Sequence, residues 1–225
     1  MSKTNPIRPV FMGGTLAEHK IFVLSVCRFD HFSIPLSLFH YVTWSVGHIS
    51  MYVIAERVFG PVGGMVLAFL LTAWAMRMDV RFGALFGVLE TSYALLASVL
   101  LSQVVVSGTS TSTTVWLALA TLLTSLAVEV GSHFVVQGHP PGPPSKKVFF
   151  VPNGEFAMIG LYFAIVFGLF FLNLDLAMRF LGYRSDDHKR VNEITNDWHR
   201  GAAAEAAAKP RIRDWHLRVI EAQSV

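Results

Sequence analysis

The sequence has little cysteine and little charge. Its 225 residues include one cysteine, Cys27, which excludes an internal disulfide and leaves no thiolate set for a zinc site. Only 15% of the residues are charged, whereas 53% are hydrophobic and the mean hydropathy is +0.50. This composition is typical of a polytopic membrane protein and not of a soluble domain.

The chain also lacks the motifs of several common function classes. It contains neither a Gly-rich phosphate loop nor a Gly-x-Ser-x-Gly nucleophile elbow. The net charge of +3 is small and lies mainly in the tails, so we expect contact with lipid headgroups and no nucleic-acid partner. The segment 1–20 has no long apolar stretch, which argues against a secretory signal peptide.

Five apolar segments predict membrane-embedded helices, at 34–53, 61–76, 82–106, 114–136 and 156–172. A span needs roughly 20 apolar residues, with about 17 as a lower limit, so the second segment is marginal. We therefore predict an all-α protein, a polytopic transmembrane helical bundle with four to six membrane-embedded helices. Its orientation stays open, because five spans would place the basic residues of the two tails on opposite sides.

The polar stretches divide the chain into three predicted regions. Residues 1–30 form a polar, basic arm, 31–183 the membrane domain, and 184–225 a polar, helix-prone extension. Within the membrane domain, Asp79 is predicted to cap the helix that follows it, and Gly63-Gly64 to let a neighbouring helix approach closely. The two terminal regions are expected to dock on other membrane protein subunits.

Glu129, His133 and Gln137 recur every four residues at the end of the fourth apolar segment. Four residues are close to one helical turn, so these side chains share one face of a helix. Ionisable groups at membrane depth are costly and usually mark a site. Two interpretations stay open: Glu129 orients a metal-bound His133, or the two side chains only neutralise each other.

Two more histidines, His31 and His40, bracket the start of the first apolar segment. Pro35 favours the first turn of a helix, so the chain before it can turn and bring His31 over the N-terminal end of that helix, towards His40. One interpretation is a metal site built from His31, His40 and His133, for which a nearby carboxylate would favour non-haem iron. The other is that these histidines are hydrogen-bonded core or interface residues.

Two further polar residues lie inside apolar segments. His48 continues a four-residue spacing from His40 through Trp44, and its alternatives are an interfacial anchor or a functional group. Glu90 is an isolated acid, expected to pair with a histidine or with Arg57 or Arg77.

Three blocks of the sequence resemble one family, the metal-dependent 2-hydroxy-fatty-acid dioxygenases, which are small membrane proteins of fatty acid α-oxidation. The blocks are 29–40, with its two histidines; 76–86, similar to that family's Asp-x-x-x-Gly turn between two spans; and 129–137, which is followed by prolines. Their order and spacing fit, and they cover about 29–183 of the chain.

The resemblance implies a helical membrane fold in which His31, His40 and His133 correspond to the family's iron-associated histidines. It also implies Fe(II) as the cofactor, and a reaction in which dioxygen converts a 2-hydroxy fatty acid to the acid one carbon shorter. Glu129, Gln137 and His139 would then orient the ligands through hydrogen bonds.

The chain departs from the family pattern at four positions. Phe32 stands where the family has a second histidine, Leu36 where it has asparagine, Glu129 where it has glutamine, and Gln137 where it has glutamate. These departures favour a non-catalytic accessory or structural subunit of a multi-subunit membrane complex, such as a mitochondrial respiratory complex or ATP synthase. The alternative is an active Fe(II)-dependent dioxygenase. The favoured location is the mitochondrial inner membrane, with the endoplasmic reticulum as the alternative.

Overall fold

All regular structure in the described part of the chain is helical, which confirms the predicted all-α class. The computed structural model describes residues 15–31, 34–133, 135 and 168–208. Its helices are α1 (Leu16–Asp30), α2 (Ile34–Phe59), α3 (Gly63–Met78), α4 (Val80–Val106), α5 (Thr111–Ser132), α7 (Gly168–Leu181) and α8 (Ser185–Ala208).

Short polar side chains set the beginnings of three of these helices. Thr15 and Glu18 form a reciprocal capping box at α1, and Ser110 accepts a hydrogen bond from the amide of Thr113 at α5. Asp79 accepts from the amide of Phe82 and caps α4. The role predicted for Asp79 is therefore confirmed.

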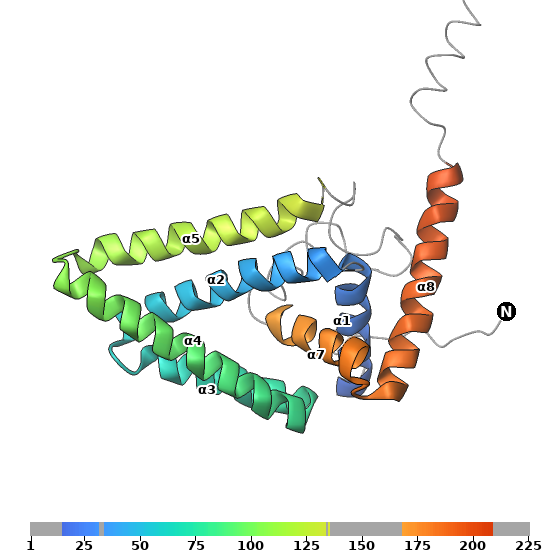
Figure 1. The fold of residues 1–225 in the computed structure, drawn as a ribbon, viewed down its shortest axis with the longest axis horizontal. Coiled ribbons are helices and arrows are strands. Elements are labelled where there is room, and N and C mark those ends of the chain that lie inside the picture. The colour runs from blue at the N-terminus through green and yellow to red at the C-terminus, as the bar shows by residue number, and fades with distance from the viewer. Residues whose placement is uncertain (1–14, 32–33, 134, 136–167, 209–225) are drawn as a thin grey trace, which may run out of the picture.

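Helices α2 to α5 run alternately away from and back towards α1, α7 and α8 (Figure 1). Helix α2 packs against α3, α4 and α5, and α3 packs along α4. A Cβ atom on Gly63 would lie 2.3 Å from the carbonyl oxygen of Ala55, so α2 and α3 meet at backbone contact there. This close approach is what the glycine pair predicted.

Helices α1, α7 and α8 form the other end of the molecule. Phe29 of α1 stacks on His199 of α8, with ring centroids 4.5 Å apart, and forms a T-shaped pair with Trp198. A buried ion pair joins α1 to α7, because Arg28 donates from Nε to Asp175 at 2.7 Å. Part of the predicted N-terminal arm and part of the predicted extension thus pack on each other.

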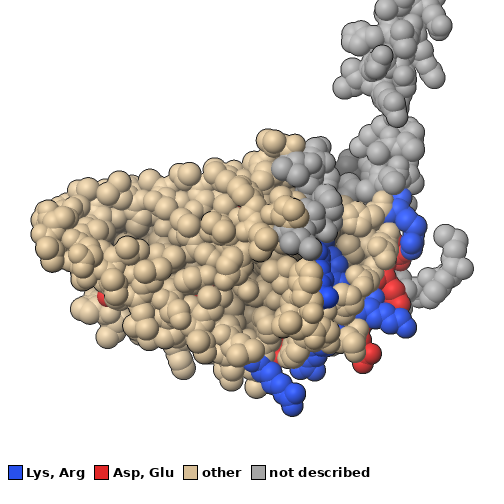
Figure 2. Space-filling view, viewed as in Figure 1, with Lys and Arg blue, Asp and Glu red and all other residues tan. Residues whose placement is uncertain are grey.

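The charged side chains gather at this end. Figure 2 shows Lys, Arg, Asp and Glu around α1, α7 and α8, whereas most of the surface of α2 to α5 on this face is uncharged. The exposed apolar side chains of α4 and α5 include Val88, Leu95, Trp116 and Leu117. An apolar outer surface of this kind suits contact with lipid tails.

Fewer helices qualify as complete membrane spans than the sequence predicted. In the described residues, α4 and α5 are long and apolar enough to cross a membrane. A third span results only if α1 and α2, which are bent by 113° at their junction, count as one. Helix α3 has 16 residues and is short for a bilayer. Residues 156–167 of the expected segment at 156–172 lie outside the described part of the chain. The described helices give two or three candidate spans, fewer than the four to six predicted.

Candidate metal centre

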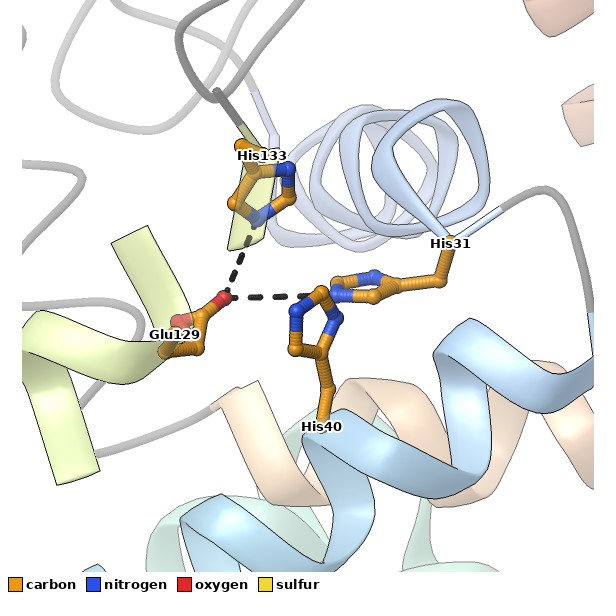
Figure 3. Close-up of side chains that lie close together, drawn as sticks. All are labelled: His31, His40, Glu129 and His133. Atoms are coloured by element: carbon orange, nitrogen blue, oxygen red, sulfur yellow. Dashed lines mark hydrogen bonds and ion pairs between the residues drawn. The ribbon is translucent and has the colours of Figure 1, made fainter. Parts of the chain in front are cut away.

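Four ionisable side chains from three helices meet at the charged end of the bundle. His31 follows the last residue of α1, His40 lies in the second turn of α2, and Glu129 and His133 lie at the end of α5 (Figure 3). All four are buried, with exposed fractions of 2%, 0%, 3% and 1% in that order. We refer to these four residues as the His–Glu cluster.

The side chains of the cluster point towards one another. Nε2 of His133 lies 3.2 Å and Nε2 of His31 lies 4.0 Å from Oε1 of Glu129. The ring centroids of His31 and His40 are 4.4 Å apart, and those of His40 and His133 are 5.0 Å apart. One possible ligand atom from each residue lies within 4.8 Å of all the others. The predicted approach of His31 to His40 is thus present.

The hydrogen bonds of His31 fix which ring nitrogen carries its proton. Nδ1 lies 2.7 Å from the carbonyl oxygen of Cys27, and a carbonyl can only accept. Nδ1 therefore donates, and Nε2 of the neutral ring presents its lone pair to the cluster. This Nε2 has no hydrogen-bond partner among the described residues.

The hydrogen bonds around His40 likewise fix which of its ring nitrogens carries the proton. The hydroxyl of Ser132 donates to the carbonyl oxygen of Glu129 at 2.7 Å, so its proton is already committed. Nε2 of His40 lies 2.6 Å from this hydroxyl oxygen and must therefore be the donor. Nδ1 of His40 keeps a lone pair, and it also lacks a partner in the part of the chain that the structure describes.

These unpaired buried atoms fit a metal ion. Buried polar groups are normally hydrogen-bonded, and a buried carboxylate without compensation is costly. Oε2 of Glu129 has no hydrogen-bond partner among the described residues either, so three of the four side chains hold an unused acceptor atom. Imidazole nitrogen and carboxylate oxygen together are the donors of non-haem iron and of zinc sites.

The spacing requires only a small contraction around a metal. Two ligands on one such ion lie at most about 4.4 Å apart, since each metal–ligand bond is about 2.0–2.2 Å. The largest separation in the cluster, 4.8 Å, exceeds this limit by a few tenths of an ångström.

The other candidate residues lie elsewhere. His48 and Glu90 pair with each other between α2 and α4, with Nδ1 of His48 3.0 Å from Oε2 of Glu90. His48 is 1% exposed, so it is a buried residue and not an interfacial anchor. Gln137 and His139 lie outside the described residues.

Two residues of the site were not among the predicted ones. Ser132 fixes the His40 ring, and its position directly before His133 was the available signal. Trp44 contacts both His31 and His40, with ring centroids 5.3 Å and 6.1 Å away. Its place four residues after His40, on the same helix face, indicated this contact.

The fold and the site define a class: a helical protein with apolar helices able to cross a membrane, and a buried cluster of three histidines and one glutamate. No protein-family model, curated protein or solved structure matches this chain.

Proposed function

We propose that this protein binds ferrous iron at His31, His40, Glu129 and His133, and that it acts on 2-hydroxy fatty acids as a membrane-embedded dioxygenase. The convergence of four buried ligand atoms within 4.8 Å carries the proposal. The resemblance of the blocks 29–40, 76–86 and 129–137 to the 2-hydroxy-fatty-acid dioxygenases supports the choice of substrate.

The residues of the cluster would contribute ligand atoms and negative charge to the metal site. His31 and His40 present preset lone pairs through Nε2 and Nδ1, because Cys27 and Ser132 hold their other nitrogens. Glu129 supplies one negative charge, which offsets part of the charge of a divalent ion. The bound iron would supply open positions for dioxygen and substrate.

We further propose that α2, α3, α4 and α5 are all embedded in the membrane, the lower limit of the predicted range. Both α1 and α8 then lie on the same side as the cluster, since α2 to α5 form two pairs of passes. The basic residues of this side include Lys20, Arg28, Arg77, Arg81 and Arg184, whereas the α2–α3 turn adds only Arg57. The positive-inside rule places the cluster on the cytoplasmic or matrix side.

The second candidate is a non-catalytic accessory subunit in the mitochondrial inner membrane. Helix α8 favours it, because Figure 1 shows α8 reaching beyond the bundle, with exposed residues such as Asp186, Lys189 and Arg200. Leu36, which stands where the family pattern has asparagine, is buried, and its apolar side chain carries no polar atom to orient a ligand. The cluster would then keep only its structural role in joining α1, α2 and α5.

Iron analysis separates the two candidates. The purified protein is expected to hold one iron per chain after reconstitution with ferrous iron, and His133→Ala is expected to lose at least about tenfold in affinity. His48→Gln is the matched control, a buried histidine of α2 outside the cluster, and should retain iron. Wild-type protein that binds no iron while co-purifying in a stable multi-subunit particle would overturn the dioxygenase proposal and leave the accessory subunit.

A further inference from the structure

A second polar group lies between α2 and α4, inside the apolar part of the bundle. Glu90 is 0% and His48 is 1% exposed. Oε2 of Glu90 accepts a hydrogen bond from the hydroxyl of Tyr52 and lies 3.0 Å from Nδ1 of His48. Helix α2 carries a polar or aromatic residue every four positions, at His40, Trp44, His48 and Tyr52. The second polar group therefore lies on the same face of α2 as His40 of the His–Glu cluster, about two turns further along the helix.

The pair has two unused atoms that can hold a proton. Nδ1 of His48 donates to Glu90, which leaves Nε2 of the neutral ring as an acceptor. Nε2 of His48 and Oε1 of Glu90 are both buried, and neither has a hydrogen-bond partner among the described residues. Without a further proton the pair carries one negative charge, and with it the pair is neutral.

A small cavity lies next to His48 on the side of α5. Its volume is about 20 Å³, enough for one water molecule, and it is lined by Thr43, Trp44, Gly47, His48, Leu122, Ser125 and Leu126. The indole Nε1 of Trp44 is buried and lacks a partner in the described residues. The ring of Trp44 also contacts His31 and His40. Trp44 therefore lines the cavity with His48 and also contacts the cluster.

We propose that His48 and Glu90 form a proton-binding site that serves the His–Glu cluster through the cavity beside Trp44. One proton binds at Nε2 of His48 or Oε1 of Glu90, and only an N–H or O–H bond forms or breaks. The destination of the proton rests on the proposed function, whereas the binding site itself does not.

Titratable and uncharged side chains from the neighbouring helices surround the pair. Tyr52 and Tyr93 are the titratable groups in electrostatic contact with Glu90. Helix α5 contributes Leu122, Ser125 and Leu126 at the cavity, none of which titrates. Helix α3 places Gly64 against Tyr52, and α7 places Gly168 against Trp44.

Infrared difference spectroscopy between acidic and alkaline samples tests proton binding in the metal-free protein. With ¹³C-labelled glutamate and ¹⁵N-labelled histidine, the wild type should show a titrating band of the pair. Glu90→Gln, which keeps the shape and can still accept from Tyr52, should lose it, and so should His48→Gln. Glu56→Gln is the matched control, because Glu56 lies on the same α2–α4 interface and accepts hydrogen bonds from Ser98. Identical spectra for the wild type and both pair variants would overturn the proposal.

Filling the cavity tests the exchange route. A Cβ atom on Gly47 would lie 3.6 Å from Cδ1 of Leu122, an ordinary contact, so Gly47→Ala is tolerated and occupies the cavity. Exchange of the bound proton in D₂O should then slow by roughly tenfold, because it requires local opening of the helix pair. Gly64→Ala, whose Cβ would lie 3.6 Å from the carbonyl oxygen of Tyr52 away from the cavity, should exchange as the wild type does. Equal rates in all three proteins would refute the cavity as the route.

Iron content keeps the two proposals apart. If the wild type binds no iron but the pair titrates, the proposed function fails and the proton site stands. If the wild type and Glu90→Gln bind iron equally and neither shows the titrating band, only the proton site fails.

Discussion

At the scale of single residues, the buried carboxylate of Asp175 is compensated by an arginine from another helix. Asp175 of α7 is 0% exposed and lies 2.8 Å from Nε of Arg179 in addition to its bonds with Arg28. Arg28 also donates to the side-chain oxygen of Asn192 on α8 at 2.6 Å. One guanidinium therefore joins α1, α7 and α8, which a lysine ammonium could not do with the same planar geometry.

Replacement of Arg28 tests this role. Arg28→Ala leaves Asp175 buried with Arg179 alone, so we expect a loss of about 3 kcal/mol in the free energy of unfolding. Arg200→Ala is the control, since its ion pair with Asp197 is exposed and worth at most about 1 kcal/mol. Denaturant unfolding in detergent micelles measures both variants, and equal stability of the two would contradict the role of Arg28.

At the scale of elements, one carboxylate ties two turns together. Asp79 between α3 and α4 accepts from the hydroxyl of Tyr183 at 2.7 Å and from Nε of Arg184 at 2.9 Å. Tyr183 and Arg184 form the turn between α7 and α8. Burial alone would raise the pKa of Asp79, but the hydrogen bonds from Tyr183, Phe82 and Arg184 together hold it below its usual value of 3.8.

The lowered pKa of Asp79 predicts a specific pH dependence of stability. A depressed pKa in the folded state contributes stability above the unfolded value and loses it as the pH falls through the folded value. The wild type should therefore lose stability below about pH 4, relative to Asp79→Asn measured at the same pH. Thermal unfolding between pH 7 and pH 3 measures the difference, and parallel curves for the two proteins would rule out this contribution.

At the scale of the whole molecule, charge and apolar surface are separated along the long axis of the bundle. The His–Glu cluster, the Asp79 turn and helix α8 lie at the charged end. The α2–α3 and α4–α5 turns lie at the opposite end, where the described loop residues of the second turn carry no charge. This separation is consistent with the proposed topology, in which both described terminal helices lie on one side of the membrane.

Site-directed labelling tests this topology. Cysteines introduced at Ser112 near the α4–α5 turn and at Asp186 in α8, both exposed, should react with a membrane-impermeant maleimide from opposite sides of sealed vesicles. Cys27 is buried, and a Cys27→Ser background removes its residual reactivity. Reaction of both positions from the same side would contradict the proposed passage of α2 to α5 through the membrane.

The sequence by itself determined the helices and part of the site. Apolar runs broken at Gly60-Pro61 and Asp79 predicted α2, α3 and α4, because local capping and hydropathy act over a few residues. The four-residue spacing of Glu129 and His133 likewise predicted their contact of 3.2 Å. The number of complete spans was predicted too high, because the helices as they begin and end in the structure leave only two or three that are long and apolar enough.

Only the tertiary structure decided which distant residues meet. A histidine, Arg57 or Arg77 was the predicted partner of Glu90, and the packing of α2 on α4 selected His48. The same packing of α1, α2 and α5 brought His31, His40, Glu129 and His133 to one point and left lone pairs unused there. The physical reason is that spacing along one helix fixes a face, whereas contact between helices depends on how those faces pack against one another.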